Sequence, residues 1–218
     1  MTVTKTITLR PDGETWCKIC GITKPQHAQL CSRLGADAIG LVFVEGSPRA
    51  LTLDVARDVA NAIRVTRMGL FVNADPELIV EAIRITDLHV LQFQGDEDPD
   101  FCQAFGLPYV KAVRVQATTD LHELSRAYGS AMALQLDAYV DGVAGGTGQQ
   151  FEWNLWPEHC NLPLILAGGL TPSNVGEAIR KLHPAGVDVS GGVESDVKGE
   201  KDPQRIRKFI QEVRNVRK

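Results

Sequence analysis

Short apolar runs alternate with amphipathic segments along this chain. The runs are almost continuous in hydrophobic residues, as in 37–43 (D-A-I-G-L-V-F), which is typical of a parallel strand covered on both faces. The segments between the runs carry apolar residues at helical spacing; in 203–216 these are Ile206, Phe209, Ile210 and Val213. The pattern therefore predicts alternating strands and helices from residue 16 onward.

Each apolar run and each amphipathic segment gives one expected element. Strands are expected at 16–20, 37–43, 68–72, 88–93, 109–115, 131–137, 163–167 and 186–190. Helices are expected at 25–34, 53–63, 76–84, 99–105, 120–128, after Asn154, at 172–182 and at 203–216. Residues that favour a helix N-cap precede several of these helices, three of them followed by proline, and we expect caps at Asp75, Thr171, Asp202, Thr52 and Thr119.

About eight strand–helix units without a break in composition predict an α/β fold, a single-domain (β/α)8 TIM barrel over residues 16–218. The polar segment 1–15 is expected to be an N-terminal extension ahead of it. An open doubly wound sheet is the alternative, and it would usually carry a Gly-x-Gly-x-x-Gly turn after its first strand. Here that turn reads Cys20-Gly21-Ile22-Thr23, which favours the barrel.

Composition and charge narrow the function classes. The 218 residues include 23 Lys and Arg against 27 Asp and Glu, a net charge of -4 without a basic stripe, so no nucleic-acid partner is expected. No apolar run approaches the roughly 18 residues of a membrane span, so no membrane partner is expected either. The five cysteines are odd in number and irregularly spaced, which fits a reducing cytoplasm better than a disulfide framework.

Chemistry in such a barrel lies at the C-terminal ends of the strands and in the loops that follow them. None of the five histidines falls at such a strand end, so neither a histidine metal site nor a Ser-His-Asp arrangement is expected. The residues that do fall there are Cys20, 44–49, Asn73, 94–97, 114–116, Asp137, Gly168-Gly169 and Ser190-Gly191-Gly192.

Cys20 and Asp137 are the candidates for proton transfer. Cys20 could be a general base or a nucleophile, although a free cysteine is more often a small buried hydrophobe. Asp137 directly follows an apolar strand, where packing does not call for an acid, although it could cap a loop. A thiol and a carboxyl across one barrel mouth make a base–acid pair. Cys17 and Cys20 lie three apart on a strand and so point to opposite faces, which argues against a shared metal or redox site.

Glycine-rich turns come late in the chain, at 145–148, 168–169 and 191–192. Loops after the seventh and eighth strands often bind phosphate in barrels, although tight turns alone also need glycine. Arg49, after the second strand, could hold a carboxylate or be a surface arginine paired with an acid on a helix. Lys111 could form a Schiff base, but its place within the fifth strand favours a structural ion pair low in the barrel.

Taken together, the chain resembles the phosphoribosylanthranilate isomerase family of tryptophan biosynthesis. The resemblance covers nearly the whole chain from Cys17 onward, and the joint order of its motifs is specific. The motifs are K-I-C-G-I-T (18–23), G-A-D-A-I-G-L-V-F (35–43), S-P-R (47–49), L-F-V-N (70–73), L-Q-F-Q-G-D-E (91–97), L-D (136–137), G-G-T-G (145–148), F-E-W (151–153), A-G-G-L-T-P-x-N-V (167–175) and V-D-V-S-G-G-V-E-S (187–195).

The resemblance implies an Amadori rearrangement of N-(5-phosphoribosyl)anthranilate without a metal or organic cofactor. It implies Cys20 as general base, Asp137 as general acid and Arg49 as the group that holds the anthranilate carboxylate. It places further substrate-binding residues at Gln94, Asp188, Gly146, Gly168, Gly169, Ser190, Gly191 and Gly192. The chain is then expected to be a cytoplasmic monomer or homodimer that binds a small phosphorylated molecule.

Two positions depart from the family pattern. Gln94 stands where the family usually has histidine, and it can hydrogen-bond but cannot titrate. Ser190-Gly191-Gly192 stands where Ser-Ser-Gly is common, which removes one hydroxyl and keeps the backbone donors. Another sugar-phosphate enzyme on the same fold and a barrel that binds a phosphosugar without turnover remain alternatives, and a turnover assay separates the second from an enzyme.

Overall fold

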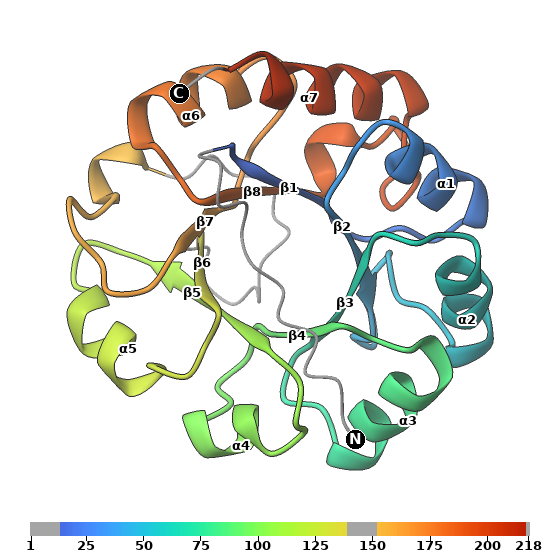
Figure 1. The fold of residues 1–218 in the computed structure, drawn as a ribbon, viewed down its shortest axis with the longest axis horizontal. Coiled ribbons are helices and arrows are strands. Elements are labelled where there is room, and N and C mark those ends of the chain that lie inside the picture. The colour runs from blue at the N-terminus through green and yellow to red at the C-terminus, as the bar shows by residue number, and fades with distance from the viewer. Residues whose placement is uncertain (1–13, 139–151, 217–218) are drawn as a thin grey trace.

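Parallel strands pair in chain order, and the last pairs with the first to close a barrel (Figure 1). The structure is a computed structural model, and it describes residues 14–138 and 152–216. The strands are β1 (Trp16–Ile19), β2 (Ala38–Val42), β3 (Thr66–Phe71), β4 (Val90–Phe93), β5 (Tyr109–Val115), β6 (Ala133–Ala138), β7 (Leu164–Leu166) and β8 (Gly186–Val189). The predicted (β/α)8 barrel is confirmed. Its division from an extension at 1–15 stays a prediction, because residues 1–13 lie outside the described part.

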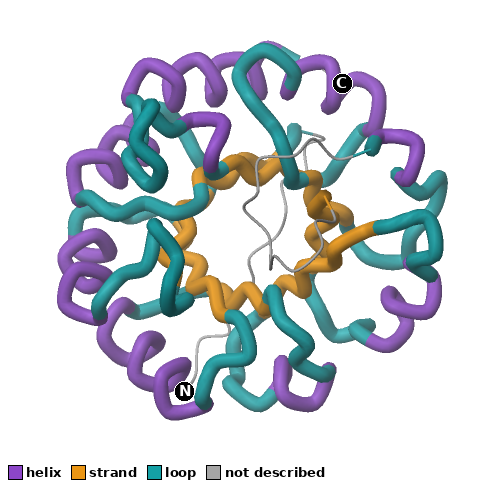
Figure 2. The backbone as a smooth tube through the Cα atoms, turned by 180° about the vertical axis from the view of Figure 1, so that it is seen from behind, coloured by secondary structure: helices purple, strands orange, loops and turns teal. Residues whose placement is uncertain are grey.

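The helices form a ring around the barrel, which Figure 2 shows from the opposite side. They are α1 (Pro25–Arg33), α2 (Leu53–Asn61), α3 (Pro76–Thr86), α4 (Pro99–Gln103), α5 (Leu121–Ala127), α6 (Val175–Leu182) and α7 (Pro203–Asn215). Two short 3-10 helices, η1 (Trp153–Leu155) and η2 (Gly191–Val193), follow β6 and β8. In place of the short helix expected after Asn154, the structure has the single 3-10 turn η1, which includes Asn154.

Two of the expected N-caps were wrong. Helix α6 begins at Val175 with Asn174 at its N-cap, because Asn174 accepts a hydrogen bond from the Thr171 backbone at 2.8 Å and so forms a separate turn before the helix. Helix α5 is capped by Asp120, whose carboxylate accepts from the backbone N–H of Glu123, instead of by Thr119. The caps at Thr52 and Asp202 are confirmed by their hydrogen bonds to the first turn. Asp75 occupies the N-cap of α3 without such a bond.

The barrel interior is built in layers of side chains. Its lower layer is apolar: Trp16, Ala38, Met68, Val90, Val110, Ala133 and Ile165 form one buried cluster. Because side chains alternate along a strand, residues two and four places further on also point inward. The next layer is polar and contains Lys18, Gln92, Gln135 and Asp188, all buried. The inward-facing side chains are therefore apolar near the N-terminal ends of the strands, the floor of the barrel, and polar closer to its mouth.

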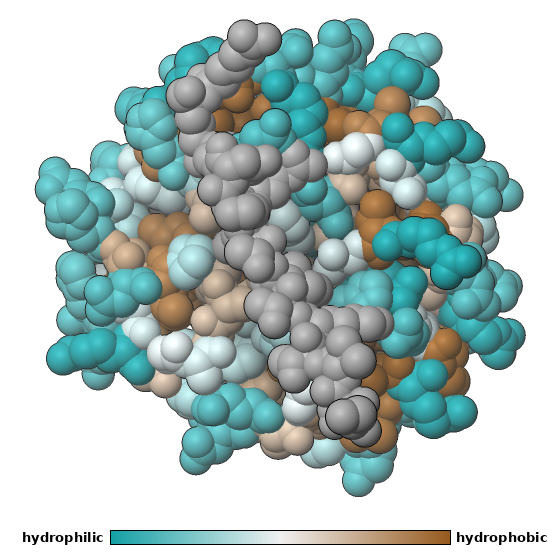
Figure 3. Space-filling view, in the orientation of Figure 1, coloured by the Kyte–Doolittle hydropathy of each residue, from teal (hydrophilic) through white to brown (hydrophobic). Residues whose placement is uncertain are grey.

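The larger apolar cluster lies between the strands and the surrounding helices. Hydrophilic side chains occupy most of the outline of the molecule in Figure 3, with smaller apolar patches between them. In the described residues, no helix has the length and hydrophobicity needed to cross a membrane. Across 14–138 and 152–216, His, Cys, Asp and Glu side chains form no group suited to a metal ion.

Candidate active site

Cys20 and Asp137 lie at the same end of the barrel, on opposite sides of its mouth. Cys20 directly follows β1 and Asp137 is near the end of β6. Their parity matches that of Trp16 and Ala133 in the apolar floor, so both side chains are directed inward. They are 5% and 7% exposed, respectively, which leaves each a narrow opening to the mouth. The two predicted proton-transfer residues therefore lie at the same end of the barrel interior, while their roles remain a prediction.

The pairing of Cys17 with Cys20 does not occur. Cys17 packs in the outer cluster, whereas Cys20 packs with Val42 and Leu70 inside the barrel. All five cysteines are free thiols. Burial raises the pKa of Cys17 well above its usual range, so this thiol is inert. The prediction that the two sulfurs face opposite sides of the strand is confirmed.

A charged network lies directly below Cys20. The ammonium of Lys18 donates to Asp188 Oδ2 at 2.8 Å and to Gln92 Oε1 at 2.7 Å, and Lys18 is fully buried. Burial lowers the pKa of Lys18, but Asp188 and Cys20 raise it by more, so the side chain carries its charge. Gln92 lies on β4 and Asp188 on β8, so one lysine links three strands through the interior.

The pKa of the Cys20 thiol reflects opposing influences. Burial raises it above the usual range, and Asp188 raises it further. Lys18 lowers it through its charge and a hydrogen bond, and the charge of Lys201 also lowers it. The two lysines therefore work against desolvation at the one thiol that faces the barrel interior.

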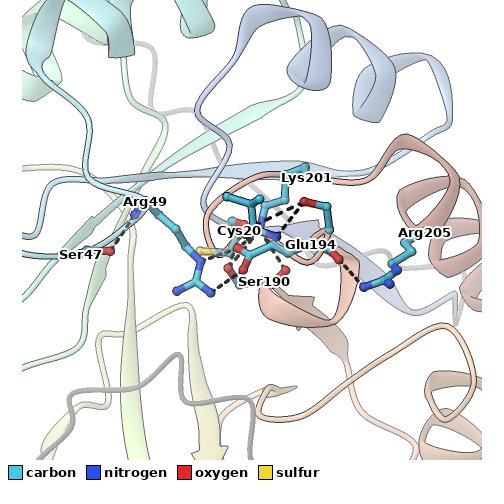
Figure 4. A network of polar contacts seen from close by, with 9 residues as sticks. Cys20, Ser47, Arg49, Ser190, Glu194, Lys201 and Arg205 are labelled. Atoms are coloured by element: carbon cyan, nitrogen blue, oxygen red, sulfur yellow. Dashed lines mark hydrogen bonds and ion pairs between the residues drawn. The ribbon is translucent and has the colours of Figure 1, made fainter.

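Arg49 is held at the mouth by Glu194, in the loop after β8 (Figure 4). Its Nε and Nη2 donate to the two carboxylate oxygens at 2.6 and 3.0 Å, a bidentate pair. Arg49 is 7% exposed, so the alternative of a surface arginine was wrong. Its Nη1 donates to no atom in the described part of the chain and is the edge left for another acceptor.

Glu194 also binds the ammonium of Lys201 at 2.9 Å, and Lys201 donates to the carbonyl of Ser190. Burial raises the pKa of Glu194, but the hydrogen bond from Arg49 and the charge of Lys201 lower it to about 2. The backbone carbonyl of Glu194 accepts from Arg205 of α7 (Figure 4). The carboxylate is thus ionised and fixed between two buried cations.

The glycines of the turns after β7 and β8 are required for different structural reasons. Gly168 and Gly169 have φ of +82° and +64°, the left-handed region, so this turn requires them. A Cβ on Gly192 would lie 1.8 Å from the carbonyl oxygen of Leu170, which excludes any side chain. The backbone N–H groups of Gly191 and Gly192 donate to no acceptor in the described residues, so they are available at the start of η2. Gly146 lies outside the described residues.

Two other predicted positions have simpler surroundings. Gln94 follows β4 and is 7% exposed, and its amide makes no hydrogen bond with the described residues. Lys111 donates to Glu97 at 2.8 Å and lies over the ring of Tyr128, so the predicted ion pair is confirmed. That pair is beside the loop after β4, on the outer face of the strand, instead of low in the barrel.

Lys18, Gln92, Glu194 and Lys201 were missed by the sequence analysis. The parity that separated Cys17 from Cys20 also places Lys18 on the same face as Cys20, so this residue could have been found. For Glu194 and Lys201 no periodicity helps, because their contact depends on how the loop after β8 folds back; an isolated antiparallel bridge joins the two residues there.

Comparisons with known proteins agree with this geometry. The sequence model of the N-(5'-phosphoribosyl)anthranilate (PRA) isomerase family matches residues 17–212. An N-(5'-phosphoribosyl)anthranilate isomerase of Pseudomonas fluorescens (strain SBW25) is 50% identical over 200 residues, which cover 91% of this chain and 95% of that protein. One from Thiobacillus denitrificans is 47% identical over 199 residues, with 90% and 97% covered.

Solved structures give the same picture. The phosphoribosyl anthranilate isomerase of Thermus thermophilus has a TM-score of 0.83 and 30% identity, covering 93% of this chain and 100% of that one. A phosphoribosyl anthranilate isomerase in complex with reduced 1-(o-carboxyphenylamino)-1-deoxyribulose 5-phosphate has a TM-score of 0.77 and 32% identity, with the same coverage. At these identities the likeness extends beyond the fold.

Proposed function

We propose that Cys20 is the general base and Asp137 the general acid of this chain, which belongs to the N-(5'-phosphoribosyl)anthranilate isomerase family. The reaction is the isomerisation of N-(5'-phosphoribosyl)anthranilate to 1-(2-carboxyphenylamino)-1-deoxyribulose 5-phosphate in tryptophan biosynthesis. The observation that carries the proposal is the position of the two side chains, which are both directed into the barrel at the same end, Cys20 directly after β1 and Asp137 near the end of β6.

In the proposed mechanism, Asp137 donates a proton to the furanose ring oxygen, the C1–O bond breaks, and the anthranilate nitrogen supplies the electrons for an iminium at C1. The thiolate of Cys20 then removes the proton from C2, and the electron pair neutralises the iminium to give an enolamine. Tautomerisation of the enolamine gives the ketone. Each positioned proton transfer contributes about 10²–10⁴ in rate.

The remaining residues are proposed to bind the two ends of the substrate. The free Nη1 edge of Arg49 is suited to the anthranilate carboxylate, and the pair with Glu194 holds it in place. The N–H groups of Gly191 and Gly192 are suited to phosphate oxygens, together with the turn at Gly168 and Gly169. Gly146 and Ser190 are proposed to complete this end, and Gln94 and Asp188 to line the site between the two ends.

The test is turnover of phosphoribosylanthranilate, followed by the loss of anthranilate fluorescence. Cys20→Ala and Asp137→Asn are each expected to reduce kcat by at least about 10²-fold, the amount that one positioned proton transfer supplies. Cys160→Ala, a half-buried thiol outside the barrel interior, and Asp120→Asn, which keeps a capping side chain, are the matched controls and should retain activity. Activity of both site variants at the level of the controls would contradict the assignment.

We further propose that the protein acts in the cytoplasm as a monomer or homodimer. Its five free cysteines, four of them buried, suit a reducing compartment. A solved relative from Thermotoga maritima is described as a dimeric isomerase from which monomers were generated, so either state is compatible with the fold. Light scattering after size-exclusion chromatography distinguishes the two, and cell fractionation tests the location.

A further inference from the structure

Lys18 is a buried charge for which the proposed reaction has no direct use. It is 0% exposed, and its ammonium is paired with Asp188 in the polar layer of the barrel. A buried ion pair seldom stabilises a fold more than apolar residues of the same volume would. In the same layer, Gln92 Nε2 and Asp188 Oδ1 have no hydrogen-bond partner among the described residues. Stability is therefore a poor explanation for a lysine at this position.

The glycine on the neighbouring strand shows how close Lys18 comes to Cys20. A Cβ built on Gly40 of β2 would lie 2.7 Å from the sulfur of Cys20 and 3.1 Å from Cε of Lys18. Both side chains therefore fill the space that the absent Cβ leaves. The end of Lys18 lies beside the thiol on the interior face of the barrel.

Three charged side chains act on the Cys20 thiol. Lys18 lies in β1, two residues before Cys20, Asp188 lies in β8, and Lys201 lies in the loop before α7. The charge of Lys201 is bound by Glu194, which the Arg49 guanidinium also engages. The charge of Lys18 has the largest lowering effect on the pKa of Cys20, and a hydrogen bond adds to it.

We propose that Lys18 is a positioning residue that stabilises the Cys20 thiolate from inside the barrel, and that Asp188 and Gln92 hold its ammonium in place. The inference rests on the proposed role of Cys20 as general base. In this proposal Asp188 acts within the protein, because its Oδ2 holds Lys18 beneath the thiol. This role does not depend on what Oδ1 of Asp188 contacts.

The test measures the titration of Cys20 in the free enzyme. The rate of Cys20 alkylation by iodoacetamide is followed against pH, with the Cys20 peptide quantified by mass spectrometry. In Lys18→Gln the midpoint is expected to rise by about 1 unit or more, the effect of removing one nearby opposite charge. The acid limb of the pH profile of kcat/KM should move upward by a similar amount, because the base must be deprotonated to act.

A second variant distinguishes a change in the titration of Cys20 from a loss of the fold. Lys18→Gln leaves Asp188 buried without its partner, whereas Lys18→Gln with Asp188→Asn keeps a neutral hydrogen-bonding pair. The midpoint should rise in the double variant also, because Lys18 has a larger effect on Cys20 than Asp188 does. The matched control is Lys111→Gln with Glu97→Gln, another buried pair at 2.8 Å, which lies outside the barrel and should leave both pH profiles unchanged.

Failure of this inference is separable from failure of the proposed function. If the Lys18 variants titrate like the wild type while Cys20→Ala still abolishes turnover, Lys18 has no such role and the base assignment stands. If the control pair shifts the profiles as much as the Lys18 variants do, the effect is a general loss of packing and the inference is overturned. If Cys20→Ala turns over normally, the base assignment itself is wrong.

Discussion

Glu194 holds two cations at once, and this contact positions the Arg49 guanidinium at the barrel mouth. The carboxylate binds Arg49 in bidentate fashion and Lys201 through a single oxygen. All three side chains are almost completely buried. Removing the carboxylate would leave two buried positive charges facing each other, so one acid determines the electrostatics of this side of the mouth.

The low pKa of Glu194 predicts acid-sensitive stability. In the folded protein it is about 2, against an ordinary 4.5. Because the folded value is the lower one, the contribution is present above pH 4.5 and is lost as the pH falls toward 2. Its size is on the order of 3 kcal/mol. Urea unfolding at pH 7 and pH 3 should show wild type more stable than Glu194→Gln at pH 7, with a smaller difference at pH 3.

The control for this experiment is Glu81→Gln. Glu81 pairs with Arg84 on the exposed face of α3, where solvent screens the charges. Its loss should change the free energy of unfolding little at either pH. A difference between wild type and Glu194→Gln that stays constant from pH 7 to pH 3 would contradict the assigned pKa.

At the residue scale, sequence could indicate which side chains reach the mouth but not what they contact there. The strand parity correctly sorted Cys17 from Cys20, and the same parity was enough to place Lys18 inside. The partners of Lys18, Gln92 and Asp188, lie 74 and 170 positions away along the chain, so their contact exists only once the barrel has closed. Arg49 was likewise visible, while its partner Glu194 was not.

At the scale of the elements, β2 approaches β1 closely because Gly40 has no side chain. In Gly40→Ala the new Cβ would meet the Cys20 sulfur at 2.7 Å and its Cα at 3.0 Å. We expect a loss of about 1–3 kcal/mol in the free energy of unfolding, since a packed interior does not accept an added methyl. We also expect a lower kcat, because the thiol is displaced. Urea unfolding and steady-state turnover measure the two effects.

Gly176→Ala in α6 should have the opposite effect on stability. A Cβ there would meet its nearest atom at 3.5 Å, which is ordinary contact, and the backbone needs no left-handed conformation. Gly176 lies in the first turn of α6, where alanine is favoured over glycine by less than the roughly 1 kcal/mol of a helix interior. The variant should therefore unfold at higher urea concentration with unchanged kcat. Destabilisation by Gly176→Ala, or tolerance of Gly40→Ala, would contradict this account of the two glycines.

The elements themselves were largely predictable, and their ends were not. Strands buried on both faces give short apolar runs, and their length and their regular alternation with longer amphipathic segments separate them from helices. The start of α6 was placed too early because Thr171-Pro172 has the composition of a cap. The competing turn at Thr171 depends on the Asn174 side chain, which binds both the Thr171 backbone and the Gly169 carbonyl. Residue types alone do not show which of the two possible turns forms, because this depends on the three-dimensional position of the Asn174 side chain.

At the scale of the whole molecule, the last helix helps to hold the closed barrel together. Arg214 of α7 donates to the backbone carbonyls of Thr15 and Gly35 at 2.9 and 2.7 Å and to the Asp37 carboxylate at 2.7 Å. Asp37 in turn accepts from the backbone of Cys17 at the start of β1. The end of the chain is thereby joined to the first strand and to the approach to the second.

This arrangement predicts that Arg214→Ala loosens the attachment of α7 to the start of β1 and to the segment before β2, without touching the active site. Three hydrogen bonds from a charged donor are lost, and the Asp37 carboxylate keeps fewer partners, so the free energy of unfolding should fall by about 2 kcal/mol or more. Amide exchange should quicken first in β1, while kcat should stay close to wild type. Arg57→Ala, which removes an exposed pair with Asp54 on α2, is the control and should change stability by less than about 0.5 kcal/mol. Equal effects of the two variants, or faster exchange confined to α7, would mean that the barrel closes without help from its last helix.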